Sequence, residues 1–227
     1  MDDAPERYEP QGPGTITDLQ PQRKNPHRLS VFLDGAFAFG VYQDVVLEQG
    51  LYPGQRLSVE DQQAVLAADQ YHLARARALH FLAHRGRTEE EVRRKLRQVG
   101  FGEAVTEQTL DRLRELGYLN DAAYARAYTQ ARYRSRGYGP RRIRDELRRR
   151  GVSAPLIDEA LAELAEQADP LEAARRHARR RWRRLVHEPD AYKRRRKLSD
   201  FLVRRGFEYD VIRQLVEELE RDDDLCD

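Results

Sequence analysis

The apolar positions in the N-terminal part of the chain recur with a period of two. In residues 29–33 and again in residues 37–41, every second position holds a large apolar side chain, which is the pattern of a half-buried strand. Asp34-Gly35 stands between the two runs, and this dipeptide favours the positive backbone angles of a two-residue type I′ turn. We therefore expect a β-hairpin, completed by a third strand at residues 15–19.

Helical elements are expected after the hairpin. A short helix is predicted at residues 43–49, followed by a turn at Tyr52-Pro53-Gly54. A second helix is expected to begin at Ser58, because Ser58 and Asp61 have the spacing of a capping box. Residues 15–70 thus predict a small domain of a β-hairpin and a helix, and residues 1–14 before it are polar and predicted to be a disordered leader.

From residue 71 onward the apolar positions recur every three to five residues, which predicts helices. One motif occurs three times: an aliphatic residue, then Leu four residues later, then Gly after four more, followed by an apolar residue. Each glycine is expected to end its helix, because Gly readily adopts the left-handed conformation that follows a helix C-cap. The copies are Val92, Leu96 and Gly100; Ile143, Leu147 and Gly151; and Leu198, Leu202 and Gly206.

Amphipathic stretches precede and follow each motif, so each copy predicts a three-helix unit. We place these units at residues 71–119, 120–168 and 169–221, with an acidic tail at residues 222–227. One unit of this size buries little apolar surface, so neighbouring units are expected to pack in series. The predicted fold class is mainly α: three tandem three-helix repeat units in an elongated or curved array, with a small N-terminal segment that contains a β-hairpin.

The distribution of charge changes this picture more than the composition does. The 227 residues contain 41 Lys and Arg and 39 Asp and Glu, so the formal net charge is only +2. Residues 122–151, however, carry ten Arg and two acids, and residues 171–206 carry fourteen Lys and Arg and four acids. Residues 152–172 carry six acids and no base, and residues 208–227 carry nine acids and two Arg. In the last two units, the first two helices are predicted to be basic and the third acidic.

Two interpretations of the basic helices stay open. Such runs are usually solvated faces whose charges pair with nearby acids. The other interpretation is a binding face, because Arg predominates over Lys and its guanidinium makes bidentate contacts with phosphate or carboxylate. Trp182 falls on the apolar stripe and is assigned to the core rather than to a stacking site. The candidate residues for binding a partner or DNA are Arg141, Arg142, Arg144, Arg148, Arg149, Arg175, Arg176, Arg179, Arg180, Arg183, Arg184, Lys193, Arg194, Arg195, Arg196 and Lys197.

No arrangement typical of catalysis or of cofactor binding stands out. His80 and His84 have the i,i+4 spacing of a metal-binding pair, but the sequence supplies no third ligand near them. Asp222-Asp223-Asp224 is expected to be a frayed acidic end rather than a cation site. The single cysteine, Cys226, excludes an intrachain disulfide and a Cys-based zinc site. We therefore expect a protein that is not an enzyme and that holds no cofactor and no metal.

The chain lacks the signals of secretion and of membrane insertion. Residues 1–14 have no basic region followed by an apolar run, and no apolar stretch approaches the roughly 18 residues of a membrane span. With its single cysteine, the protein is expected to be cytoplasmic, not bound to a membrane, and monomeric.

Residues 116–152 resemble the RecX family of bacterial recombination regulators. The likeness extends upstream through residues 76–82, Thr88 and the first repeat motif to Phe39-Gly40-Val41, and more loosely into the third unit, so that it covers residues 15–218. The third unit departs from the family pattern in a longer connection at residues 188–192 and in its density of Arg. The residues that carry the central likeness are Leu116-Gly117-Tyr118-Leu119-Asn120-Asp121, Tyr124-Ala125, Gly139, Ile143, Leu147 and Arg150-Gly151-Val152.

The resemblance implies a regulator that binds the RecA recombinase filament on DNA and modulates, mainly by inhibition, its ATPase activity, filament growth and strand exchange. It places the protein in DNA repair and the SOS response, with single- and double-stranded DNA as further expected partners. Two rival hypotheses stay open. One is a stand-alone DNA-binding helical-repeat module, and the other is a helical-repeat protein that binds some other acidic protein. Inhibition alone and inhibition combined with stimulation would use the same contacts.

Overall fold

The structure, a computed structural model, describes residues 8–167 and 169–224. Residues 1–7 of the expected disordered leader and residues 225–227 of the expected acidic tail lie outside the described part of the chain. The chain divides into two compact units. The first holds the sheet and the first group of three helices and ends at Leu119, and the second begins at Asn120 and also includes residues 88–90. Each unit is described by itself.

The sheet of the first unit is antiparallel and has the strand order β3-β2-β1-β4. The predicted hairpin is present, with Leu33 opposite Ala36 and with positive φ angles at Asp34 (48°) and Gly35 (86°). The predicted third strand is β1, whereas β4 is too short to show an alternating pattern in the sequence. The strands are β1 (Gly14–Pro21), β2 (Arg28–Leu33), β3 (Ala36–Tyr42) and β4 (Arg56–Leu57).

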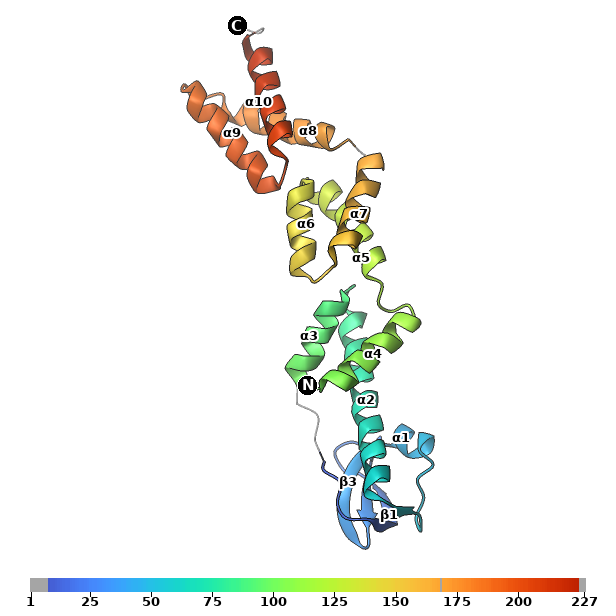
Figure 1. Cartoon of the computed structure of the whole chain (residues 1–227). Helices are drawn as coiled ribbons and strands as arrows, with labels where there is room; N and C mark the ends of the chain where they lie inside the picture. Colours follow the sequence, from blue (N-terminus) through green and yellow to red (C-terminus); the bar gives the residue numbers. More distant parts are fainter. Residues whose placement is uncertain (1–7, 168, 225–227) are drawn as a thin grey trace. The chain divides into compact units, whose positions relative to one another are not determined.

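Helix α2 (Val59–Ala83) joins the sheet to the first group of three helices (Figure 1). Its start is the predicted capping box: the Ser58 side chain accepts from the backbone N–H of Asp61 at 3.1 Å, and the Asp61 side chain accepts from that of Ser58 at 2.8 Å. Val65 near its beginning is buried with the sheet, and Ala78 near its end is buried with α3 and α4. The domain boundary that we placed between residues 70 and 71 therefore falls inside one continuous helix. No Gly or Pro between residues 59 and 83 interrupts it.

A buried ion pair fastens α2 to the sheet. Asp69 of α2 is 2% exposed and accepts hydrogen bonds from the guanidinium of Arg28 at 3.2 Å and from the backbone N–H of Tyr42 at 2.8 Å. The same Arg28 nitrogen, NH2, donates to the carbonyl of Gly40 at 2.6 Å. Burial raises the pKa of the Asp69 carboxyl, and the positive charge of Arg28 opposes that rise.

Residues 8–13, which we expected to be disordered, are ordered by contacts with the first unit. Gln62 of α2 is fully buried. Its side-chain oxygen accepts from the backbone N–H of Gln11 at 2.9 Å, and its amide nitrogen donates to the carbonyl of Gly12 at 3.1 Å. The ring of Tyr8 packs edge-on against Phe37, with centroids 5.9 Å apart. The buried amide of Gln62 thus satisfies two backbone groups of this polar segment.

The three predicted three-helix units are present, and each has its own apolar core. Below we call them the first, second and third triplets. In the first triplet, the end of α2 packs with α3 (Glu89–Val99) and α4 (Glu103–Glu115). The second contains α5 (Asp121–Ala131), its π-helical extension η1 (Arg132–Arg136), α6 (Pro140–Arg149) and α7 (Ala154–Gln167). The third contains α8 (Pro170–Trp182), the short 3₁₀ helix η2 (Arg183–Leu185), α9 (Ala191–Arg205) and α10 (Tyr209–Asp224). Helix α1 (Gln43–Glu48) precedes them beside the sheet.

The repeated motif ends the middle helix of each triplet in the same way. Gly100, Gly151 and Gly206 have φ angles of 103°, 84° and 82°. The residue after each glycine donates its backbone N–H to the carbonyl of the motif Leu at 3.1 to 3.2 Å, which is the long hydrogen bond of a Schellman motif. The motif's aliphatic positions are fully buried: Val92, Leu96, Ile143, Leu147, Leu198 and Leu202.

Candidate partner-binding surface

The end of α9 meets the beginning of α6 inside the second unit. The backbone N–H of Gly139 donates to the carbonyl of Arg205 at 2.7 Å, and that of Arg141 donates to the carbonyl of Gly206 at 3.1 Å. These N–H groups at the start of α6 have no acceptor within their own helix, and the carbonyls at the end of α9 have no donor within theirs. The contact therefore satisfies both helix ends and brings opposite ends of two helix dipoles together.

Two glycines allow this close approach. A β-carbon on Gly139 would overlap the carbonyl of Gly206, and a β-carbon on Gly206 would overlap the backbone of Arg142. Gly206 also has a positive φ angle, whereas Gly139, at φ −80°, has a backbone conformation open to any residue. At position 139, glycine is thus required by the neighbouring helix and not by its own backbone.

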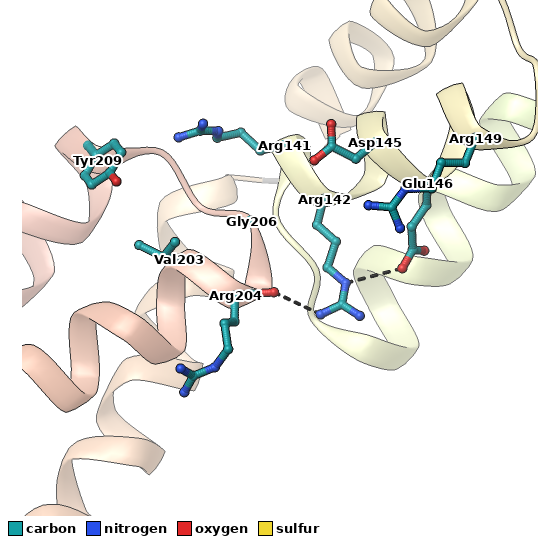
Figure 2. A pocket seen from close by; sticks show the side chains of 9 residues that line it. All are labelled: Arg141, Arg142, Asp145, Glu146, Arg149, Val203, Arg204, Gly206 and Tyr209. Carbon is teal, nitrogen blue, oxygen red and sulfur yellow. Dashed lines mark hydrogen bonds and ion pairs between the residues drawn. The ribbon is translucent and has the colours of Figure 1, made fainter.

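Arginine side chains reinforce the junction between α6 and α9. Arg142 donates to the carbonyl of Arg204 at 2.9 Å and to the carboxylate of Glu146 at 3.3 Å, as the dashed lines of Figure 2 show. Arg205 donates to the carbonyls of Arg136 and Gly137 at 2.6 and 3.2 Å. Burial lowers the pKa of Arg205. Several arginines of this region therefore serve to hold helices together.

A groove of about 420 Å³ lies at this junction (Figure 2). The side chains of Val203 and Tyr209 are 42% and 67% exposed, so the groove offers apolar surface beside its charges. The guanidinium of Arg141 lies 5.7 Å from the ring centre of Tyr209. A mixed lining of this kind suits a protein segment that combines acidic and apolar side chains. The groove is lined by Arg141, Arg142, Asp145, Glu146 and Arg149 from α6, and by Val203, Arg204, Gly206 and Tyr209.

About half of the candidate basic residues pair with acids, as the solvated-face interpretation expects. Helix α10 supplies several of the partners: Glu218 accepts from Arg175 at 2.8 Å and from Arg179 at 3.3 Å, and Glu220 accepts from Arg195. The hydrogen bond to Glu218 raises the pKa of Arg175. The acidic third helix of the triplet therefore neutralises part of its basic first and second helices. The remaining pairs are Arg141 with Glu208, Arg142 with Glu146, Arg144 with Asp158, Lys193 with Asp190, and Lys197 with Glu188.

The other candidates include a cluster of arginines on one side of α8 and η2. Arg176, Arg180, Arg183 and Arg184 are exposed, and none forms an ion pair with any residue in the described part of the chain. Their spacing of four, seven and eight residues from Arg176 puts them on one helical face. Together with Arg179 they line a shallow hollow. We call these four residues the α8 arginine face.

Three more candidates, Arg148 and Arg149 of α6 and Arg196 of α9, are exposed and likewise have no ion pair among the described residues. Arg194 lies with its guanidinium 4.7 Å from the ring centre of Trp182, which is 6% exposed in the core of the third triplet. The predicted basic face is thus divided among several surfaces of the second unit.

Sequence reasoning missed Arg204 and Tyr209, which line the junction groove. It also missed Arg136 and Arg205, which a hydrogen bond joins, and His177, whose ring lies against Gly137. The sequence marked Gly139-Pro140 as a helix start and Gly206 as a helix end. The contact between these two helix ends follows from the packing of the second triplet on the third, which local sequence does not determine.

The other chemical candidates do not form a site in the described residues. The rings of His80 and His84 pack edge-on with centroids 5.1 Å apart, and no group of three or more potential metal ligands lies in the described part of the chain. Asp222 lies 3.8 Å from Arg179. Among the described helices, none is both long and apolar enough to cross a membrane.

Comparison with known proteins covers most of the chain. Residues 14–58 match the family model described as the regulatory protein RecX N-terminal domain. Residues 74–113, 120–161 and 167–216 match the first, second and third three-helix domains of RecX. The four matches follow one another in the order of the observed domains.

Relatives and solved structures agree with these matches. A protein of Clostridium acetobutylicum named regulatory protein RecX is 30% identical over 207 residues, which cover 90% of this chain and 96% of that protein. Another of that name, from Geobacillus kaustophilus, is 34% identical over 88% of this chain and 75% of its own length. A crystal structure of regulatory protein RecX, 29% identical, superposes with a TM-score of 0.72 over 90% of this chain and 99% of its own. A crystal structure of RecX from Lactobacillus salivarius, 26% identical, gives 0.61 over 67% of this chain and 98% of its own. This chain therefore belongs to the RecX family of regulatory proteins.

Proposed function

We propose that this protein binds the RecA recombinase filament on DNA and restrains its growth, its ATP hydrolysis and its strand exchange, without catalysing a reaction itself. The observation that carries the proposal is the succession of four RecX domain matches along the chain. The proposal places the protein in the cytoplasm, as a monomer without a cofactor.

The distribution of free charge supports a binding role for the second unit. Ion pairs neutralise about half of the basic candidates, but the four exposed guanidinium groups of the α8 arginine face form no ion pair among the described residues. These unpaired guanidinium groups can therefore attract the negative charges of a partner. A polyanionic filament of protein and DNA offers such charges in both of its components.

The junction groove offers exposed apolar surface, which suits a protein partner better than DNA. Exposed apolar surface next to arginines is typical of a protein interface, where an apolar anchor is surrounded by polar contacts. We assign the junction groove to the recombinase and the α8 arginine face to the DNA or to acidic protein surface beside it.

The test is an ATPase and strand-exchange assay with RecA, ATP and single-stranded DNA. The double variant Arg176→Gln/Arg183→Gln removes two unpaired charges of the α8 arginine face. Its half-inhibitory concentration should rise about tenfold, the equivalent of ~1.4 kcal/mol. The matched control, Arg195→Gln/Lys197→Gln, removes two charges of α9 that are already paired with Glu220 and Glu188, and should change inhibition little. If the wild-type chain altered neither activity over a wide range of ratios, the proposal would be wrong.

The rival function is a stand-alone DNA-binding module, which the unpaired α8 arginine face favours. Under this hypothesis, affinity for DNA alone would account for any effect on the filament. Engagement of about five phosphates predicts a slope near −3.5 for log K against log salt on single strands. The two functions differ for a RecA filament whose DNA is fully covered by RecA. If the chain still inhibits this filament, DNA binding alone does not explain the inhibition, even where the salt slope is steep. A flat slope would remove DNA as a direct partner.

A further inference from the structure

A second cavity, of about 370 Å³, lies between η1, α8 and α9 of the second unit. We call it the arginine cavity. It differs from the junction groove because no carboxylate of the described residues lines it. Five of its lining residues are arginines: Arg136, Arg180, Arg181, Arg184 and Arg205. The others are Ser135, His177 and Phe201.

The charges of this cavity are not neutralised within the described residues. Arg136, Arg180 and Arg184 form no ion pair there, although α10 supplies acids to Arg175 and Arg179 of the same helix α8. The Nε atom of Arg181 is buried and has no hydrogen-bond partner among the residues that the structure describes. A buried donor without an acceptor is rare in folded proteins, and often marks a place that a ligand or ion completes.

Two residues hold the cavity in shape. Arg205 donates to the carbonyls of Arg136 and Gly137, and its guanidinium lies 4.8 Å from the ring centre of Phe201. His177 packs directly on Gly137, where any β-carbon would overlap its imidazole ring. The π-helical turn, α8 and α9 are therefore fastened to one another around the cavity before any ligand binds, which reduces the entropy lost on binding.

From this geometry we infer that the arginine cavity binds the phosphate groups of a single nucleic-acid strand. Guanidinium groups match phosphate oxygens with paired hydrogen bonds, and a strand carries successive phosphates to satisfy several of them. A carboxylate and a phosphodiester each have two terminal oxygens, but a nucleic-acid strand repeats its anionic group at every nucleotide. The inference deepens the proposed function and rests on it for the choice of nucleic acid as the source of the phosphates.

The imidazole of His177 lines the cavity, so its titration should respond to a bound phosphate. Burial lowers the pKa of its imidazole, and the charges of Arg205 on α9 and of Arg176 and Arg180 on α8 lower it further. Arg136 of η1, Arg181 of α8 and Arg184 of η2 also line the cavity that holds His177. A bound phosphate would oppose these charges, so binding should raise the pKa of His177 and be accompanied by proton uptake.

The experiment uses the full chain with ¹³C-labelled histidine, and NMR follows the ring signals of its six histidines during titration with an oligothymidylate strand. We expect the His177 signal to shift on binding and its pKa to rise. Arg136→Gln should weaken binding about tenfold, the usual loss for one charge-assisted hydrogen bond, and should flatten the salt slope by about 0.7.

The matched control is Arg134→Gln. Arg134 lies in the same π-helical turn and is exposed, but it does not line the cavity. This variant carries the same change in net charge, and we expect it to bind as the wild type does. Equal losses in the two variants would mean diffuse attraction to the basic surface and would overturn the inference.

Inorganic pyrophosphate and ATP form separate arms of the titration. If they shift His177 and the oligothymidylate does not, the cavity takes free phosphates, and nucleic acid is the wrong source. If no phosphate compound shifts His177, the inference fails as a whole. The recombinase assay distinguishes the two proposals. If the wild-type chain inhibits the RecA filament but no phosphate compound shifts the His177 signal, only this inference is wrong. If the oligothymidylate shifts His177 but the chain does not affect the filament, only the proposed function is wrong.

Discussion

Gly139 lies directly against Gly206, so that two helices of different triplets meet end to end. The N–H of Gly139 donates to the carbonyl of Arg205 at 2.7 Å, and the carbonyl of Gly206 accepts from Arg141 at 3.1 Å. The junction groove opens on one side of this contact, with Gly206 in its lining. Arg205, whose carbonyl takes part in the contact, also lines the arginine cavity. The backbone contact therefore positions both candidate sites.

Gly139→Ala should destabilise the second unit by about 1–3 kcal/mol, because the added methyl group separates the two helix ends and leaves buried backbone groups without partners. Chemical denaturation measures this loss. Gly102→Ala is the matched control, since Gly102 also precedes a helix, with φ −70° and ψ 164° against −80° and 167° at Gly139, but has open space around it. Equal losses in the two variants would contradict the role assigned to the contact.

Arg28→Met should destabilise the first unit by about 3–5 kcal/mol, because it leaves the buried carboxylate of Asp69 without its ionic partner. The comparison is Arg213→Met, which breaks a pair with Asp210 whose side chains are 75% and 94% exposed. That loss should stay below about 0.5 kcal/mol. Urea unfolding of both variants checks the difference, and a small loss for Arg28→Met would mean that the pair does not fasten α2 to the sheet.

The stability of the second unit should fall as the pH drops below about 6.5. The pKa of His177 is lowered in the folded protein, so the unfolded chain binds this proton more readily than the folded chain does. Stability therefore rises with pH between the lowered pKa and the unfolded value of about 6.5, and it is lost as the pH falls through that window.

His177→Gln should remove this component from a series of denaturation curves between pH 5 and pH 8. His187→Gln, which changes an exposed side chain, should keep the wild-type dependence. Were the His177→Gln profile to coincide with that of the wild type, the titration would belong to another group.

Glu218→Gln should strengthen binding to single-stranded DNA. Glu218 accepts from Arg175 and Arg179. Its neutralisation would leave Arg175 paired with Glu172 alone and Arg179 with Asp222 alone, so both guanidinium groups would be more available to phosphate. We expect affinity to rise several-fold and the salt slope to steepen by about 0.7 for each additional phosphate contact. Fluorescence anisotropy at several salt concentrations measures both quantities.

Asp210→Asn serves as its control, because it makes the same change of charge at a carboxylate that is 94% exposed and lies 3.7 Å from Arg213. If both variants gained affinity equally, long-range charge and not the release of Arg175 and Arg179 would be responsible.

Local sequence determined most of the helices and strands. The hairpin follows from a period of two around Asp34-Gly35, and the ends of three helices follow from Gly100, Gly151 and Gly206. In each case the chemistry that decides the structure lies within a few residues, as a turn conformation or a helix cap. The capping box at Ser58 and Asp61 is of the same kind.

Contacts distant in the sequence decided the rest. The order of residues 8–13 depends on Gln62, and the continuity of α2 means that one helix contributes to two cores. The basic candidates could be selected by composition, but whether each is free or paired depends on which acids α7 and α10 bring within reach. That information is absent from a helix read by itself.

The sequence by itself thus determined three repeats of a helical unit, their caps and the total charge that each helix carries, because periodicity and capping are local properties of the chain. The tertiary structure decided which arginines face solvent, which pair with α10, and which surround a cavity. It also explains the glycine at position 139. A β-carbon there would overlap Gly206, which ends another helix 67 positions further along the chain.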